Sequence, residues 1–205
     1  MGIFGIKTKA EREEQEKQRL IQEKMIKDSE GVTKYLDAAE KQLESLFNRC
    51  QIEDDKKILV DIRIITEELY KFKKEKTLSS NVMQRLEKCS ELASLMIRMN
   101  VNMFGSYNVR QPAKHKFENA EVITLPTNFE SCENLVEKLE KQKDKDSSVG
   151  FIHKLHFIND LITHCKTFVK DSDKYDELLK RVSKVLIYNI DVFGPISERE
   201  DNLMI

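Results

Sequence analysis

Apolar side chains recur every three or four residues along most of the chain, which is the periodicity of amphipathic helices. In the first half of the sequence this pattern predicts three helices, over residues 33–50, 55–75 and 81–104. The apolar faces of the first two helices consist of Leu36, Ala39, Leu43, Leu46, Phe47, Ile58, Ile62, Ile65, Leu69 and Phe72. We expect a bundle in which these faces are buried against one another.

Turn residues are scarce, with six glycines and three prolines among 205 residues. An all-β fold needs turn residues about every 8–12 positions, so this composition favours an all-α fold. Asp54 is placed to cap the second predicted helix, and Ser79 or Ser80 to cap the third. Gly105 stands where a left-handed C-terminal cap belongs.

Residues 7–28 are strong helix formers without glycine or proline, and their first part is polar on every side. We expect Gly31 to end this helix. Residues 1–30 are therefore predicted to form a charged helical arm that projects from the bundle. Its apolar residues come late and form a candidate partner-binding strip, consisting of Leu20, Ile21, Met25 and Ile26. We expect this strip to pack on the body of the protein or on a partner helix, as in a coiled coil.

Residues 106–127 are predicted to form a linker, since they contain two of the three prolines. Within the linker, the apolar segment 122–125 is expected to pack as an extended strap. A second three-helix unit with a short C-terminal tail is predicted over residues 128–205. Thr127 and Glu130 have the spacing of a capping box at the start of this unit.

The two halves of the chain resemble each other. The first two helices of the 31–105 unit align with those of the second unit at an offset of 93 residues, and the third helices align at an offset of 89. In the third helices this alignment pairs identical residues, Ser94 with Ser183, Asn100 with Asn189, Phe104 with Phe193 and Gly105 with Gly194. We interpret the pattern as an internal duplication. The predicted fold class is an all-α helical bundle built from two related three-helix units plus a projecting N-terminal helix.

Basic and acidic residues nearly balance, at 35 and 36, so the formal net charge is −1. A general nucleic-acid-binding protein needs a basic surface, so nucleic acid is not an expected partner. The four cysteines are widely spaced and contain no C-x-x-C pair, which favours reduced thiols in a cytoplasmic protein. The longest apolar stretches are interrupted by Arg98 and Asp191, so no transmembrane helix is expected.

Candidate metal ligands lie on one stripe of the second helix of the second unit, and they are His153, His156, Asp160 and His164. Imidazoles and a carboxylate at this spacing suit a transition metal. The stripe lies opposite the apolar face of the helix, so we expect it to be solvated. No catalytic motif is recognised, and no cofactor is expected.

Three functional hypotheses follow. The first is a non-enzymatic cytoplasmic adaptor or scaffold that binds another protein, or a second copy of itself, through the arm or the bundle surface. The second is a peripheral protein at the inner membrane face, because an apolar N-terminal tip followed by basic residues suits an anionic membrane. That tip consists of Ile3, Phe4, Ile6, Lys7, Lys9 and Arg12. The third is a metal-binding or enzymatic bundle that uses the histidine stripe.

Overall fold

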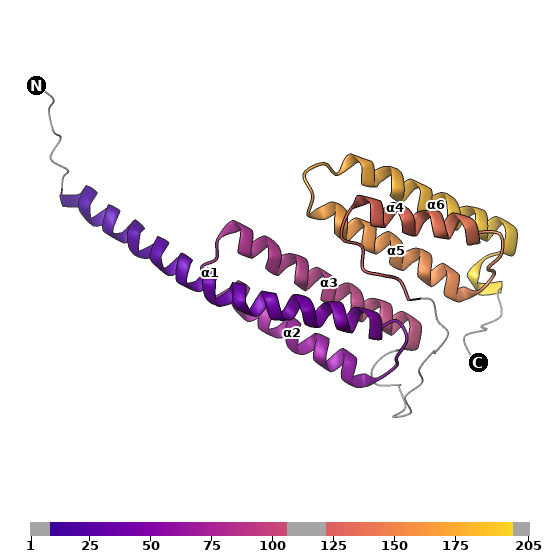
Figure 1. The fold of residues 1–205 in the computed structure, drawn as a ribbon, viewed down its shortest axis with the longest axis horizontal. Coiled ribbons are helices and arrows are strands. Elements are labelled where there is room, and N and C mark those ends of the chain that lie inside the picture. Colours follow the sequence, from indigo (N-terminus) through magenta and orange to yellow (C-terminus); the bar gives the residue numbers. More distant parts are fainter. Residues whose placement is uncertain (1–8, 106–121, 199–205) are drawn as a thin grey trace, which may run out of the picture.

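The computed structural model describes residues 9–105 and 122–198, and these residues are helical apart from short connections (Figure 1). They form no strand, so the prediction of an all-α fold is confirmed for the part of the chain described. The helices are α1 (Lys9–Arg49), α2 (Lys56–Glu75), α3 (Ser80–Phe104), α4 (Phe129–Gln142), α5 (Val149–Thr167) and α6 (Asp173–Phe193), followed by the short 3-10 helix η1 (Ile196–Glu198). None of these helices is both long and apolar enough to cross a bilayer.

Helices α1–α3 from the first half of the chain and α4–α6 from the second half, here called the two helix groups, are in contact with each other. Helices α1, α2 and α3 contact one another, as do α4, α5 and α6, and α3 packs against α5 (Figure 1). Buried apolar side chains from all six helices form one contiguous cluster. At the junction, Phe47 near the end of α1 stacks on Phe157 of α5, with ring centroids 5.8 Å apart. The hydrophobic core is therefore continuous from one group to the other.

Helix α1 passes through Gly31 without a break, so the predicted helix end at Gly31 is wrong. A glycine inside a helix costs about 1 kcal/mol relative to alanine. Val32 and Leu36 follow Gly31 and are almost completely buried. Burial of two such side chains contributes roughly 3–6 kcal/mol, which outweighs the cost of the glycine. The predicted arm and the predicted helix 33–50 are therefore one element.

The arm leaves the bundle at Asp28 and Ser29. The backbone N–H of Thr77 donates to the Asp28 carboxylate at 3.2 Å, and the N–H of Ser79 donates to Ser29 Oγ at 2.9 Å. These bonds tie α1 to the connection between α2 and α3. On the N-terminal side, every side chain from residue 9 to residue 24 is exposed. This part of α1 extends away from the other helices (Figure 1).

Two predicted helix caps lie one residue away from their observed positions. Asp55, not Asp54, caps α2, and its side chain accepts from the Lys57 N–H at 2.9 Å. The capping box of α4 is formed by Asn128 and Ser131 instead of Thr127 and Glu130. The side-chain carbonyl oxygen of Asn128 accepts from the Ser131 N–H at 2.9 Å. Asparagine is at least as favourable as threonine at the N-cap position.

The other predicted helix ends agree with the structure. Ser79 is the N-cap residue of α3 by position, but its side chain makes no capping hydrogen bond, so the predicted side-chain cap is absent there. Gly105 ends α3 with φ +80° and ψ 173°, and Gly194 ends α6 with nearly the same angles. This backbone region is essentially restricted to glycine. The two glycines therefore permit the same exit from two different helices.

The predicted strap over residues 122–125 has no regular secondary structure and packs on the body through Ile123. Ile123 is buried, and its backbone is held by the buried side chain of Gln51. The Ile123 N–H donates to Gln51 Oε1 at 2.8 Å, and Gln51 Nε2 donates to the Ile123 carbonyl at 2.9 Å. Because Gln51 Nε2 also donates to the Phe47 carbonyl at 3.1 Å, its buried amide is satisfied.

Candidate functional site

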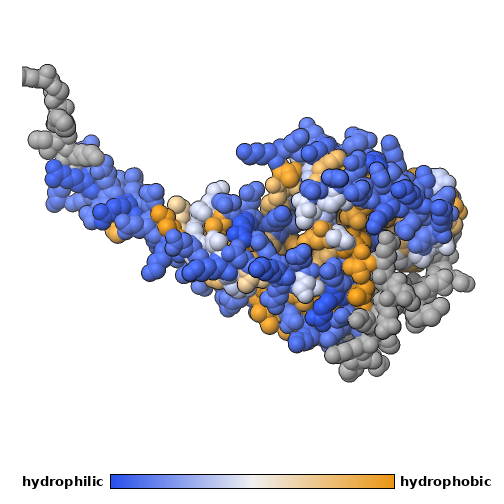
Figure 2. Space-filling model, viewed as in Figure 1, coloured by the Kyte–Doolittle hydropathy of each residue, from blue (hydrophilic) through white to orange (hydrophobic). Residues whose placement is uncertain are grey.

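The candidate partner-binding strip lies on the exposed part of α1. Leu20, Ile21 and Ile26 are 55%, 52% and 50% exposed, and Met25 is half-buried. Ile21 and Met25 are four residues apart and share one side of the helix. Leu20 points elsewhere, because consecutive helical residues are rotated by about 100°. Figure 2 shows a small apolar patch on an otherwise hydrophilic arm.

A shallow hollow lies at the base of this strip. Its volume is about 470 Å³, and it is lined by Met25, Ile26, Ser29, Thr33, Lys34 and Ser79, among others. Met25 and Ile26 thus belong both to the strip and to the hollow. The apolar surface of the arm therefore continues into a concave region beside the start of α3.

Most of the candidate membrane-binding tip lies outside the described residues. This holds for Ile3, Phe4, Ile6 and Lys7. Lys9 and Arg12 are exposed in the first turns of α1, where the Lys9 ammonium lies 3.8 Å from the Glu13 carboxylate.

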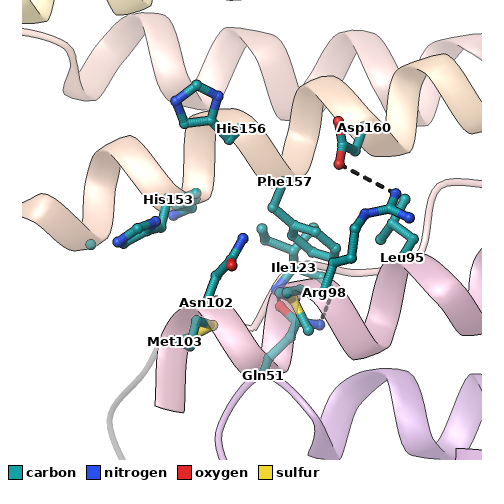
Figure 3. Close-up of a pocket in the computed structure, with 13 residues that line it drawn as sticks. Gln51, Leu95, Arg98, Asn102, Met103, Ile123, His153, His156, Phe157 and Asp160 are labelled. Carbon is teal, nitrogen blue, oxygen red and sulfur yellow. Dashed lines mark hydrogen bonds and ion pairs between the residues drawn. The ribbon is translucent and has the colours of Figure 1, made fainter. Parts of the chain in front are cut away.

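The histidine stripe lies along the junction between α5 and α3, not on a uniformly solvated face. His156 is exposed and His153 and Asp160 are half-buried, whereas His164 is buried. The prediction of a solvated stripe is therefore wrong for His164. Asp160 lies 3.5 Å from the guanidinium of Arg98 in α3 (Figure 3).

The candidate metal ligands do not converge. Figure 3 shows the rings of His153 and His156 on α5 pointing away from each other. Within residues 9–105 and 122–198, no three His, Cys, Asp or Glu side chains are grouped so that they could hold a metal ion. The metal and enzymatic hypotheses therefore gain no support from the positions of these four residues.

His164 lies at a polar cleft between α3 and α5. The residue is 6% exposed, and its Nδ1 atom has no hydrogen-bond partner among the described residues. Burial lowers the pKa of this imidazole to about 4, and the nearby charge of Lys88 acts in the same direction. The Glu91 carboxylate lies 3.6 Å from Nδ1, but its side chain is half exposed, so water weakens its attraction for a proton. His164 is therefore neutral at pH 7.

Cys50, Cys89 and Cys132 are buried, and Cys165 is half-buried. Burial raises the pKa values of Cys50 and Cys89 to about 12. A hydrogen bond between the thiols of Cys132 and Cys165 raises the pKa of Cys132 and lowers that of Cys165. Thiols with raised pKa values are poor nucleophiles at neutral pH.

A cavity of about 260 Å³ opens between α3 and α5, next to the histidine stripe (Figure 3). Its apolar lining comes from Leu95, Met99, Met103, Ile123 and Phe157. Its polar lining includes Arg98, Asn102, Lys154 and three residues of the histidine stripe, His153, His156 and Asp160. Among the lining residues, the sequence pattern indicates a role only for the histidine stripe and for the strap residue Ile123.

One signal in the sequence points to this second buried side of α5. Phe157 and Leu161 are four residues apart and lie beside the histidine stripe. Together with Phe151, Leu155 and Ile158, they widen the apolar face of α5 to roughly half of its circumference. A helix with that pattern is typically buried on more than one side.

Comparison of the chain with protein-family models, with curated proteins and with solved structures finds no match. The functional argument for this protein therefore comes from its own sequence and structure.

Proposed function

We propose that the protein is a non-enzymatic helical interaction protein, an adaptor that binds a helix of another protein along α1. The observation that carries this proposal is the exposure of Ile21, four residues before the half-buried Met25, on the part of α1 that extends beyond the bundle. In α1 the buried residues Val32, Leu36 and Leu43 follow Ile21 and Met25 at helical spacing. The core-facing side of α1 thus continues into the arm, where no other described helix covers it.

A partner helix is the occupant that best fits this surface. Amphipathic helices bind through anchors at i, i+3, i+4 and i+7, which is the spacing of Ile21 and Met25. The hollow beside Met25 and Ile26 offers room for one apolar side chain at the end of the partner. Burial of the exposed half of Ile21 contributes roughly 1 kcal/mol. The charged residues around the strip supply the salt bridges that select a partner helix.

The proposal is tested by replacing Ile21 with Asp. A photo-crosslinking residue at Gln22 captures proteins that lie along the arm, and mass spectrometry of a lysate from the source cells identifies them. Ile21→Asp should weaken capture of a stoichiometric partner at least tenfold, because it places a charge in an apolar contact. The matched control is Ile64→Asp in α2, since Ile64 is 54% exposed but lies outside the arm.

Two results would oppose this function. Capture of the same proteins by the Ile21→Asp variant would show that the strip is not the contact. A dimer of the purified chain that dissociates on Ile21→Asp, measured by light scattering, would assign the strip to a second copy instead of a different protein.

We also infer that the two groups of helices descend from one duplicated three-helix unit. The buried Asn100 donates through Nδ2 to the carbonyls of Cys50 and Glu53, at 2.6 and 3.2 Å. The buried Asn189 donates in the same way to the carbonyls of Lys143 and Asp146, at 2.8 and 2.9 Å. Both acceptor pairs are related by the 93-residue offset of the alignment, and the asparagines by the 89-residue offset. This shared bonding supports the duplication independently of the apolar pattern.

A cytoplasmic location belongs to the same proposal. All four cysteines are thiols, and three of them are buried in the core. Reduced thiols are typical of proteins of the cytoplasm.

A further inference from the structure

One side of α3 is covered by α5. Leu95 and Met99 of α3 and Phe157 of α5 line the cavity between the two helices, and each of the three is less than a tenth exposed. Beside them, the Arg98 guanidinium lies 3.5 Å from the Asp160 carboxylate. Other polar residues that line the cavity are Asn102, His153 and His156. The junction therefore shows what covers this side of α3, namely an aromatic side chain on a helix side that also carries polar residues.

The two helix groups can be compared in a fixed register. The 89-residue offset places α6 in register with α3, and the 93-residue offset places α2 in register with α5. The buried Asn100 and Asn189 support this register, because each donates to two carbonyls in the connection between the first two helices of its own group. Each residue at the α3–α5 junction thus has a counterpart on α6 or on α2.

Helix α6 exposes the side that corresponds to the covered side of α3. Tyr188 is 41% exposed, whereas its counterpart Met99 is 5% exposed. The Lys143 ammonium lies 4.6 Å from the centre of the Tyr188 ring and leaves the rest of the ring uncovered. Ile187 and Val192 are 60% and 49% exposed. This side, called the α6 surface, consists of the exposed residues Lys184, Ile187, Tyr188, Asp191 and Val192.

Helix α2 exposes the side that corresponds to the junction side of α5. Ile64 is 54% exposed, whereas its counterpart Phe157 is 7% exposed. Val60, the counterpart of His153, is 38% exposed. This side, called the α2 surface, consists of the exposed residues Val60, Arg63, Ile64 and Glu67. Figure 1 shows α2 and α6 on opposite sides of the α3–α5 pair, so the two surfaces cannot cover each other within one chain.

Opposite charges would meet if the α2 surface covered the α6 surface in the same register. Asp191 and Arg63 are the counterparts of Asn102 and His156, which line one cavity. Lys184 and Glu67 are likewise the counterparts of Leu95 and Asp160, which line the same cavity. Arg63 and Glu67 lie 2.8 Å apart, but both side chains are more than half exposed, so this pair contributes little and can be shared with a partner.

The charges balance at the edge of the same arrangement. Lys71 takes the place of His164, which lies near Lys88 and Glu91. The counterparts of these two residues on α6 are Glu177 and Lys180, whose charged groups lie 3.6 Å apart. This edge therefore neither attracts nor repels, and the two pairs across the centre decide the electrostatic fit.

We propose that copies of this chain associate head to tail, with the α6 surface of one copy covered by the α2 surface of the next. Ile187 and Tyr188 of one copy pack against Ile64 of the next, as Met99 packs beside Phe157 within the chain. Because the two surfaces differ, repeated contacts give an open series or a ring and not a closed dimer. The proposal rests on the duplicated unit inferred above and is independent of the adaptor role of α1.

Sedimentation velocity of the purified full chain tests this association. The weight-average mass should rise with protein concentration. Ile187→Asp and Ile64→Asp should each weaken the association about tenfold, because each places a charge in an apolar contact. The matched control is Val169→Asp, since Val169 is 39% exposed and lies outside both surfaces. A circular dichroism spectrum checks that the variants remain helical.

A mixture of the two variants tests the head-to-tail arrangement. The Ile64→Asp chain keeps an intact α6 surface, and the Ile187→Asp chain keeps an intact α2 surface. Mixed in equal amounts, they should form a complex of two chains, although neither variant associates by itself. A contact between two α6 surfaces or between two α2 surfaces would not give this result.

The proposal is overturned if the chain is monomeric at every concentration, if either variant still associates by itself, or if the mixture stays monomeric. Association that is lost on Ile21→Asp and kept in the other variants would assign the contact to the arm and would also overturn it. The adaptor proposal is tested separately, since Ile64→Asp should leave capture at Gln22 unchanged. A monomer would leave both the adaptor role and the common descent of the helix groups standing, because neither requires contact between copies.

Discussion

His164 illustrates at the residue scale how burial changes the chemistry of a side chain. The imidazole lies at the α3–α5 junction with Nδ1 unpartnered among the described residues, next to Lys88 and Glu91. A sequence pattern places it on the same stripe as the exposed His156. The pattern shows on which side of α5 His164 lies, but it does not show that α3 packs against that side.

His164 predicts a loss of stability in mild acid. Its pKa is about 4 in the folded protein and about 6.5 when unfolded, so between these values the unfolded state binds more protons. The stabilisation is complete above pH 6.5 and is lost as the pH falls towards 4. In the original chain this loss lowers the free energy of unfolding by up to about 3 kcal/mol over this range. Urea unfolding should show that the decrease is absent in His164→Gln.

The control for this prediction is His156→Gln, because His156 is exposed. Asp28 and Glu140 have lowered pKa values through hydrogen bonds to Thr77 and Arg181, so their stabilising effect is lost below about pH 4.5. That window overlaps the window of His164 only below about pH 4.5. A His164→Gln protein with the same pH dependence as the original chain between pH 6.5 and 4.5 would contradict the assignment.

At the scale of elements, α1 shows a local helix-breaking signal overridden by packing. Gly31 lies inside the helix with no left-handed backbone, and an added Cβ there meets nothing within 4 Å. Glycine therefore serves no conformational need at this position. Gly105 differs, because its φ of +80° at the end of α3 is strained for any residue with a side chain.

These two glycines give opposite predictions for the same substitution. Gly31→Ala should raise the free energy of unfolding by about 0.5–1 kcal/mol, because alanine loses less backbone entropy in a helix. Gly105→Ala should lower it by about 1 kcal/mol or more, because alanine disfavours positive φ. Both values can be measured by urea denaturation. If Gly31→Ala destabilises the protein, α1 bends or breaks at Gly31.

At the scale of the whole molecule, the continuous core predicts that the two helix groups unfold together. Phe47 is fully buried and stacks on Phe157 of the other group. Phe47→Ala should lower the free energy of unfolding by about 3 kcal/mol. Hydrogen exchange followed by mass spectrometry should show lower protection in α6 as well as in α2, although Phe47 belongs to α1. Unchanged protection in α6 would mean that the groups unfold independently.

The sequence by itself determined the helical elements of this protein. Its apolar periodicity predicts α2 and α3 to within one residue, and Gly105 marks the end of α3, because helix formation depends on neighbours close in the chain. The same local information predicts the strap around Ile123. It does not show that Gln51 holds that strap, since the two residues are 72 positions apart.

Only the tertiary structure decided which side chains share an environment. Packing keeps α1 helical at Gly31, buries His164 beside α3 and encloses the cavity between Met99 and Phe157. Each of these features depends on contacts between residues far apart in the chain, and a periodic pattern describes one helix at a time. The apolar face of a helix can therefore be predicted from the sequence. Which neighbour covers that face, and whether Ile21 is covered at all, depends on the assembled fold.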